Sequence, residues 1–162
     1  MSRSSESSRI KLKRVYDPAS RAEGTRILVD RLWPRGLRKE DAAIDHWCKD
    51  LAPSTALRQW FGHNVERWEE FRNRYKSELA QQPKTLAELR SFARKGPITL
   101  LFAAHDKLRN NAVVVHELLR AMRRADRVPV KTIGKTRGDM TAATEEERTR
   151  RSRQPTRSGP SL

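Results

Sequence analysis

The chain has 162 residues, of which 36% are hydrophobic, and its 35 Lys and Arg against 20 Asp and Glu give a formal net charge of +15. This length fits one domain with polar ends, so a second full core is not expected. Residues 1–9 contain no apolar run, no later stretch reaches the roughly 20 apolar residues of a membrane helix, and the single cysteine, Cys48, excludes an internal disulfide. We therefore expect a cytoplasmic protein with no membrane partner.

Three short runs of apolar residues predict β-strands. Residues 10–16 (IKLKRVY) alternate apolar and basic side chains and stop at an Asp-Pro pair, which is typical of a strand with one solvated face. Residues 26–30 (RILVD) and 97–104 (PITLLFAA) are continuous apolar runs. Such runs favour strands buried on both faces, as in a parallel sheet covered by helices.

Helical spacing of apolar residues appears between and after these strands. Ser54 can cap a first helix, and residues 65–80 form an amphipathic helix with a core-facing stripe. A capping-box pattern at Thr85 predicts the start of a third helix that ends at Gly96. Asn110 or Asn111 can cap the last helix.

The order strand, strand, several helices, strand, helix predicts an α/β fold. We expect a small three-layer domain over residues 10–125, in which helices flank a short, mostly parallel sheet. Residues 1–9 are predicted to be a disordered N-terminus. Residues 126–162 are predicted to be a basic, mostly disordered tail, because Ser, Thr, Arg and Pro dominate and no apolar face is present.

The positive charge is not confined to the ends. Residues 126–162 carry +4 and residues 1–9 carry +1, which leaves +10 of the total of +15 on residues 10–125. A basic folded part favours anionic partners, whether nucleotides, nucleic acid or acidic metabolites. It specifies none of them, and a basic surface without a dedicated partner is the alternative.

Polar residues follow each predicted strand. They are Tyr16 and Asp17 after the first strand, Asp30, Arg31, Trp33 and Arg35 after the second, and His105, Asp106 and Asn110 after the third. The carboxyl ends of parallel strands meet at one edge of a sheet, and ligands bind in the crevice outside it. We therefore expect these side chains to converge on a ligand site.

The segment Trp33-Pro34-Arg35-Gly36 predicts a rigid turn, since proline fixes its φ angle and glycine relaxes the backbone. The turn can aim Arg31 and Arg35 at a phosphate or carboxylate, which the planar guanidinium binds through two oxygens. Backbone N–H groups at the start of the last helix can add to the same anion site. In the alternative interpretation, the two arginines pair with Asp17, Asp30 or Asp106 and hold the loop.

Several residues admit a catalytic or a structural role. Asp30 and Asp106 can orient the arginines or handle a proton, and Asn110 can cap a helix and donate to a ligand. His105 and Asp106 can form a general base with its orienting carboxylate, although Asp106 can instead cap the following helix. Trp33 either packs as a lid or stacks on a ligand, and Tyr16 and Asp17 complete the predicted ligand-binding set.

The other tryptophans, the histidines and the cysteine do not form a recognisable site. Trp47, Trp60 and Trp68 lie at predicted helical positions and indicate core packing. His46 and Cys48 are two residues apart on a predicted helix and face different sides, which disfavours a nucleophilic pair. The histidines lack metal-ligand spacing, and the chain has no glycine-rich phosphate loop, GxSxG or CxxC motif, so we predict neither a metal nor a cofactor.

The motifs together resemble one bacterial family. VYDP, RILVDRLWPRG, LAPS, LRQWFGH, ERWEEFRNRY and TLLFAAHD with NNA are similar to the YeaO-like family, DUF 488, a domain of unknown function. The resemblance covers residues 10–122 and implies a compact α/β domain with the tail outside it. It supplies no reaction. The residues that match the family pattern are Tyr16, Asp17, Asp30, Arg31, Trp33, Pro34, Arg35, Gly36, Pro53, Ser54, Arg58, Trp60, Phe61, Trp68, Asp106 and Asn110.

The chain departs from that pattern at two positions. It has His105 where a basic residue often precedes the aspartate, and Asn111 where a histidine follows the asparagine. A mechanism that depends on a histidine at position 111 is therefore not open to this chain, and a family-wide role for His105 is weakened.

Three functions remain as expectations. The first is a domain that binds a small anionic ligand in the crevice, in which the ligand can also be an enzyme substrate. Binding is better supported than catalysis, because the sequence contains no recognisable activated nucleophile or metal set. The second is a nucleic-acid-associated protein that uses its basic core and the tail sequence RTRRSRQPTR. The third is an interaction module whose crevice is filled by its own salt bridges.

Overall fold

The computed structural model describes residues 9–127. The disordered ends expected at residues 1–9 and 126–162 lie outside the described residues, apart from residues 9, 126 and 127. The last helix continues to Arg127.

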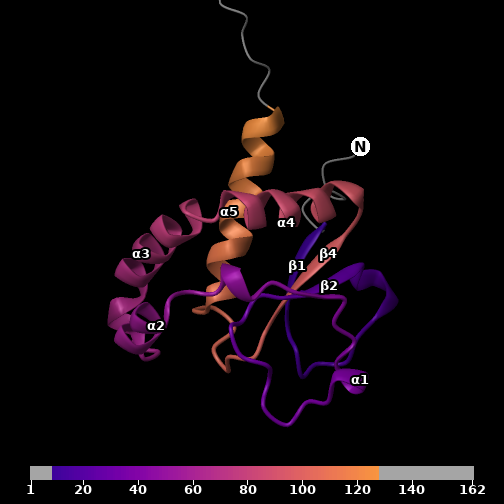
Figure 1. Ribbon diagram of the computed structural model, residues 1–162, viewed down its shortest axis with the longest axis horizontal. Helices are drawn as coiled ribbons and strands as arrows, with labels where there is room; N and C mark the ends of the chain where they lie inside the picture. The colour runs from indigo at the N-terminus through magenta and orange to yellow at the C-terminus, as the bar shows by residue number, and fades with distance from the viewer. Residues whose placement is uncertain (1–8, 128–162) are drawn as a thin grey trace, which may run out of the picture. The chain divides into compact units, whose positions relative to one another are not determined.

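A four-stranded sheet forms the centre of the domain (Figure 1). Its strands are β1 (Ile10–Arg14), β2 (Thr25–Leu28), β3 (His46–Trp47) and β4 (Ile98–Phe102), in the order β1-β4-β2-β3. All three pairs of neighbours are parallel, and Leu100 of β4 lies opposite Leu12 on one side and Ile27 on the other. The predicted α/β fold with a parallel sheet is therefore confirmed.

β4 shows why a continuous apolar run forms a central strand. All five of its residues are buried. Side chains alternate across a strand, so Ile98, Leu100 and Phe102 enter the larger core on one face, while Leu101 enters a smaller cluster on the other. A strand with an apolar side chain on each face is stable only where both faces are covered.

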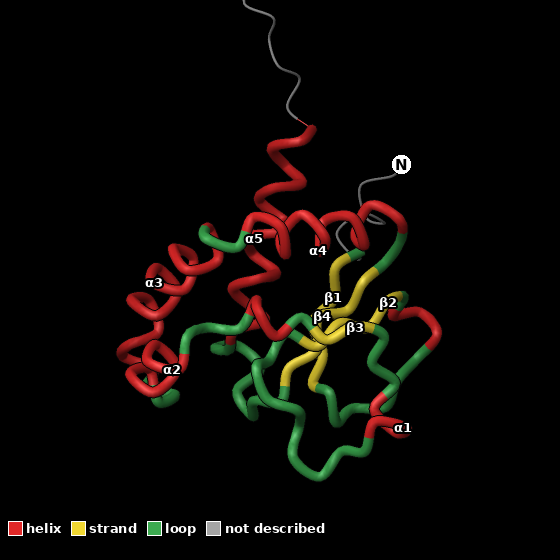
Figure 2. Tube along the Cα trace, in the orientation of Figure 1, coloured by secondary structure: helices red, strands yellow, loops and turns green. Residues whose placement is uncertain are grey.

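Helices cover the larger core. They are α2 (Thr55–Phe61), α3 (Trp68–Ala80), α4 (Pro83–Lys95) and α5 (Asn111–Arg127), with the short 3-10 turn η2 (Lys49–Leu51) before α2 and η3 (Val65–Arg67) between α2 and α3. Figures 1 and 2 show α2 to α5 gathered on one side of the strands. Their apolar stripes meet the sheet at this face, with Phe71, Tyr75 and Leu119 among the buried side chains. No described helix combines the length and apolar character that crossing a membrane requires.

The third layer is thin. The loop that follows β2 includes the four-residue helix α1 (Lys39–Ala42) (Figure 2). This loop brings Trp33, Leu37 and Ile44 onto Leu28 and Leu101. The other face of the sheet is therefore covered mainly by irregular chain, and the loop that carries the predicted site is held by its own small core.

A buried ion network anchors the start of β2. Glu23, at the end of the 3-10 turn η1 (Arg21–Glu23), contacts both Lys13 and Arg26, and its side chain also accepts a hydrogen bond from the Ser20 N–H at 2.9 Å. Burial opposes the charge, but the hydrogen bonds from Lys13 and Arg26 outweigh it and lower the pKa of Glu23 to about 2. Arg26 also donates from Nε to the Ala43 carbonyl at 2.8 Å, so the network ties the loop to the sheet.

Of the helix caps predicted at Ser54, Thr85 and Asn110, two agree with the structure and one does not. Ser54 accepts a hydrogen bond from the Leu57 N–H at 3.2 Å, and Asn110 accepts one from the Val113 N–H at 3.1 Å, so they cap α2 and α5. The capping box predicted at Thr85 is wrong, because α4 begins earlier, at Pro83. Proline at the first helical position lacks only an N–H that the helix leaves unused.

The helix predicted around His46, Trp47 and Cys48 is wrong. His46 and Trp47 form β3, which backbone hydrogen bonds from Asp45 and Cys48 hold against β2 at 2.9 Å each. A strand of two residues is too short to produce an alternating pattern. Trp60 and Trp68, in contrast, lie in helices and pack against the core as predicted.

Candidate functional site

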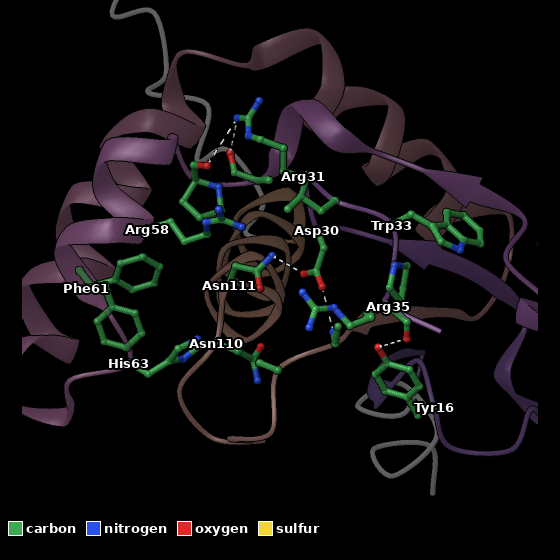
Figure 3. Close-up of a pocket in the computed structure, with 17 residues that line it drawn as sticks. Tyr16, Asp30, Arg31, Trp33, Arg35, Arg58, Phe61, His63, Asn110 and Asn111 are labelled. Carbon is green, nitrogen blue, oxygen red and sulfur yellow. Dashed lines mark hydrogen bonds between the residues drawn. The ribbon is translucent and has the colours of Figure 1, made fainter. Parts of the chain in front are cut away.

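A cavity of about 290 Å³ opens at the carboxyl ends of the strands (Figure 3). After β2, the chain crosses to the face of the thin layer, and after β4 it enters α5 on the helical face. Neighbouring strands whose connections leave toward opposite faces create a crevice between them, which is where parallel sheets bind ligands. The lining residues are Tyr16, Asp30, Arg31, Leu32, Trp33, Pro34, Arg35, Ala52, Pro53, Arg58, Phe61, His63, Phe71, Ala103, Ala104, Asn110 and Asn111.

Three arginines line this pocket: Arg31 and Arg35 from the loop after β2, and Arg58 from α2. All three are exposed. Within residues 9–127, none of them forms an ion pair with a carboxylate; the guanidinium of Arg31 instead lies 3.5 Å from the carbonyl oxygens of Ala52 and Pro53. The alternative in which Arg31 and Arg35 pair with Asp17, Asp30 or Asp106 is therefore wrong for this structure.

The turn that carries Arg35 has the predicted geometry. The Leu37 N–H donates to the Pro34 carbonyl at 3.3 Å, and Gly36 has a φ angle of 76°, which glycine adopts without steric cost. The Tyr16 hydroxyl donates to the Arg35 carbonyl at 2.9 Å. Tyr16 therefore supports the turn from the end of β1.

Trp33 packs within the thin layer. Its Nε1 donates to the Leu37 carbonyl at 2.6 Å, and its ring meets Trp47 edge-on with 5.3 Å between ring centroids. In Figure 3 the indole lies away from Asp30 and Asn111. Trp33 lines the pocket, but these contacts favour the lid-packing interpretation over stacking on a ligand.

Among the described residues, Asp30 is the acidic side chain that lines the pocket. One carboxylate oxygen accepts from the Ala103 N–H at 2.9 Å and the other from the Asn111 side-chain amide at 3.0 Å. Burial raises the pKa of Asp30 above its ordinary value, while these two hydrogen bonds and the charge of Arg58 oppose the rise. Asp30 thus joins the loops after β2 and β4 at the base of the site.

Asn110 and Asn111 are both committed to the local structure. Asn110 donates to the Asp106 carbonyl at 2.8 Å while capping α5. The Asn111 amide donates to the Val29 carbonyl and to Asp30, both at 3.0 Å, so its two N–H groups are used and its oxygen remains as an acceptor. Asn111, one of the two residues that depart from the family pattern, therefore holds Asp30.

Asp17, His105 and Asp106 do not line the cavity. Asp106 accepts from the Leu108 and Arg109 N–H groups at 2.9 and 3.1 Å and forms a turn before α5, so the expectation that it caps the helix is wrong. The hydrogen bond from Leu108 is the main cause of its lowered pKa. Asp17 lies 3.8 Å from Lys107, and His105 is exposed.

Among the lining residues that the sequence did not predict are Arg58, Phe61, His63, Phe71 and Asn111. Arg58 and Phe61 are three residues apart on α2 and so share one helical face, and both match the family pattern. His63 has a φ angle of 58°, which is uncommon for a residue other than glycine. Phe71 was expected only as a core residue of its helix, and Asn111 only as a possible helix cap; the packing of α3 and α5 brings them to the cavity.

Neither a metal site nor a reactive thiol accompanies the pocket in the part of the chain that the structure describes. No three His, Cys, Asp or Glu side chains of residues 9–127 are grouped as a metal site requires. Burial, with Glu88 and Asp50 nearby, raises the pKa of Cys48 to about 11, which keeps the thiol protonated at neutral pH.

Comparisons with known proteins place this chain in a family. A family model described as "Inactive DUF488-N3 subclade" matches residues 9–132. The chain is 47% identical over 113 residues to "Uncharacterized protein YeaO" of Escherichia coli (strain K12), covering 70% of this chain and 98% of the relative. It is 42% identical over 111 residues to "Uncharacterized protein Rv3073c" of Mycobacterium tuberculosis (strain ATCC 25618 / H37Rv), covering 68% and 93%. No solved structure matches the chain.

Proposed function

The chain belongs to the YeaO-like DUF488 family, and from this premise we propose that it binds a small anionic ligand, bearing a phosphate or carboxylate, in the pocket at the carboxyl ends of β2 and β4. One observation carries the proposal: Arg31, Arg35 and Arg58 line a single cavity, and none of them is paired with a carboxylate within residues 9–127. Guanidinium groups gathered without an ion-pair partner favour an anion from solution.

We propose binding without turnover. The family model is described as inactive, which favours a ligand-binding protein over an enzyme. Asp30 agrees with this, because both of its oxygens already accept hydrogen bonds from the protein. His105 and Asp106, the other predicted proton carriers, do not line the cavity. The role of Asp30 is then to hold Asn111 and the loop after β4.

Nucleic-acid association is the second candidate from the sequence. It relies on the basic surface of the core and on the basic tail, residues 126–162, of which only Asp126 and Arg127 are described. The described contacts contain no feature that points to nucleic acid beyond the general positive charge. The pocket therefore supports the first proposal better.

Thermal shift of the full chain tests the proposal. The ligand panel contains nucleotides, phosphorylated metabolites and di- and tricarboxylates, at two salt concentrations. A ligand at a hundred times its Kd should stabilise the protein by about 2.7 kcal/mol and raise Tm by several degrees. The double variant Arg31→Ala/Arg35→Ala should lose that shift.

The control is Arg21→Ala/Arg38→Ala, which removes the same charge from two exposed arginines outside the cavity. It should keep the shift. A shift that persists in the pocket variant, or a panel in which no compound stabilises the wild type, would contradict the proposal.

A further inference from the structure

The chemistry of the pocket walls points to a narrower ligand class. Resting on the function proposed above, we propose that the ligand is a phosphate monoester of a flat, apolar ring. Its dianionic phosphate lies among Arg31, Arg35 and Arg58, and its ring lies against Phe61 and Phe71.

The first argument is the charge balance. Arg31, Arg35 and Arg58 contribute +3, and Asp30, the one acidic side chain of residues 9–127 that lines the cavity, contributes at most −1. The excess is therefore at least +2, which matches the dianion of a phosphate monoester and exceeds the charge of a single carboxylate. Electrostatic complementarity of this kind selects among ligands that all fit the space.

The position of α5 adds to the same field. This 17-residue helix begins at Asn111, which lines the cavity, so its N-terminal dipole lies at the site (Figure 3). The N-terminus of a helix attracts negative charge and especially phosphate. The arginines and the helix thus favour the same end of the ligand.

The second argument is the apolar wall. The rings of Phe61 and Phe71 stack with 4.4 Å between centroids and 24° between their planes, and both line the cavity. Both are buried in the core, which keeps the ring pair in place before a ligand arrives. Leu32, Pro53 and Ala104 extend the apolar lining. A ligand that is polar throughout would leave this wall unused.

The third argument is size. The cavity of about 290 Å³ is many times the roughly 10–15 Å³ that a single water needs. A phosphate group fills only part of it and leaves room for a ring. The volume lies just below the range of small-molecule pockets, about 300–1,000 Å³, which favours a single ring over a larger ligand.

Calorimetric titration of the full chain with phenyl phosphate and methyl phosphate separates the two parts of the ligand, because both carry the same dianion and differ in the ring. We expect phenyl phosphate to bind about tenfold more tightly, from partial burial of the ring. Arg58→Met should weaken both probes by about tenfold or more, since it removes a charge-assisted contact. Arg21→Met, the matched control, should change neither.

A second variant tests the wall without disturbing the core. Leu32 is 60% exposed and lines the cavity, so Leu32→Ser should leave folding intact. It should lower the preference for phenyl over methyl phosphate while the affinity for methyl phosphate stays the same.

The outcomes distinguish this inference from the proposed function. Equal affinities for the two esters, both dependent on Arg58, would contradict the inference that the ligand carries a ring and would still support the proposed anion site. Binding of a dicarboxylate such as phthalate in an Arg58-dependent way, with no binding of either ester, would overturn the phosphate and again leave the anion site. No Arg58-dependent binding of any of these anions would overturn both.

Discussion

The role of each arginine in this domain is set by its surroundings. Arg26 is 5% exposed and contacts Glu23, so its charge is neutralised and it serves the fold. Arg58 is exposed and faces a cavity whose acidic side chain, Asp30, already accepts two other hydrogen bonds. A buried charge needs a partner, whereas an exposed one can remain available to a ligand.

Removing Glu23 tests the buried network. Glu23→Gln should lower the free energy of unfolding at neutral pH by about 3 kcal/mol or more, because it leaves the buried Arg26 without its counter-ion. Urea denaturation at pH 7 measures this. Glu40→Gln, an exposed change on α1, is the control and should have little effect.

The same network predicts a dependence on pH. The folded state holds the pKa of Glu23 at about 2, below the ordinary 4.5, so the stability that it contributes is present above pH 4.5 and is lost as the pH falls toward 2. The difference between wild type and Glu23→Gln should therefore shrink between pH 5 and pH 3. An equal difference at both values would show that the charge of Glu23 is not the stabilising feature.

At the scale of the element, α5 positions one side of the pocket, and its start depends on Asn110. Asn110 accepts from the Val113 N–H and donates to the Asp106 carbonyl, which joins the helix to the turn before it. Asn111, the first residue of the helix, then reaches Asp30. The cap thus determines where two lining residues lie.

Asn110→Ala should destabilise the protein by about 1 kcal/mol, the usual cost of losing a helix cap. Asn110→Asp keeps an acceptor for the Val113 N–H and should retain most of the stability. The denaturation midpoints of the two variants provide the measurement. Equal losses in both would show that the hydrogen bond to Asp106, rather than the cap, is what matters.

The elements that the sequence predicted correctly are long enough to show a clear pattern of apolar residues. α3 and α5 repeat their apolar residues over several turns, and β4 is an unbroken apolar run. β3 has two residues and is held by hydrogen bonds to β2 that leave no local pattern, so the sequence could not predict it. The start of α4 was predicted wrongly, because the helix begins at Pro83 and not after a cap at Thr85.

At the scale of the whole molecule, the net charge of +15 attracts anions of every kind. The dependence of affinity on salt concentration therefore distinguishes binding in the pocket from binding to the charged surface. Raising NaCl from 50 to 200 mM should weaken phenyl phosphate binding by less than about tenfold, because its two charges are only partly screened. A DNA duplex held through six or more phosphates should lose about a thousandfold. Calorimetry and the fluorescence anisotropy of a labelled duplex measure the two.

The Arg31→Ala/Arg35→Ala variant provides the control. It should lose phenyl phosphate binding while its affinity for the duplex changes little. If both ligands show the same steep dependence on salt, the pocket contributes nothing beyond the general charge of the surface.

The sequence by itself determined the parallel α/β fold and the turn around Gly36. Of the nine site residues that it predicted, six line the cavity, namely Tyr16, Asp30, Arg31, Trp33, Arg35 and Asn110. These features are local, because strand ends, turns and caps are encoded by neighbouring residues. Only the tertiary structure decided that Arg58, Phe61 and Asn111 join them and that Asp17, His105 and Asp106 do not. Those positions depend on how α2 and α5 pack against the sheet, and on the turn at Asp106 that directs its side chain to backbone N–H groups. Contacts between distant segments are set by the burial of shared apolar surface, which no short stretch of sequence specifies.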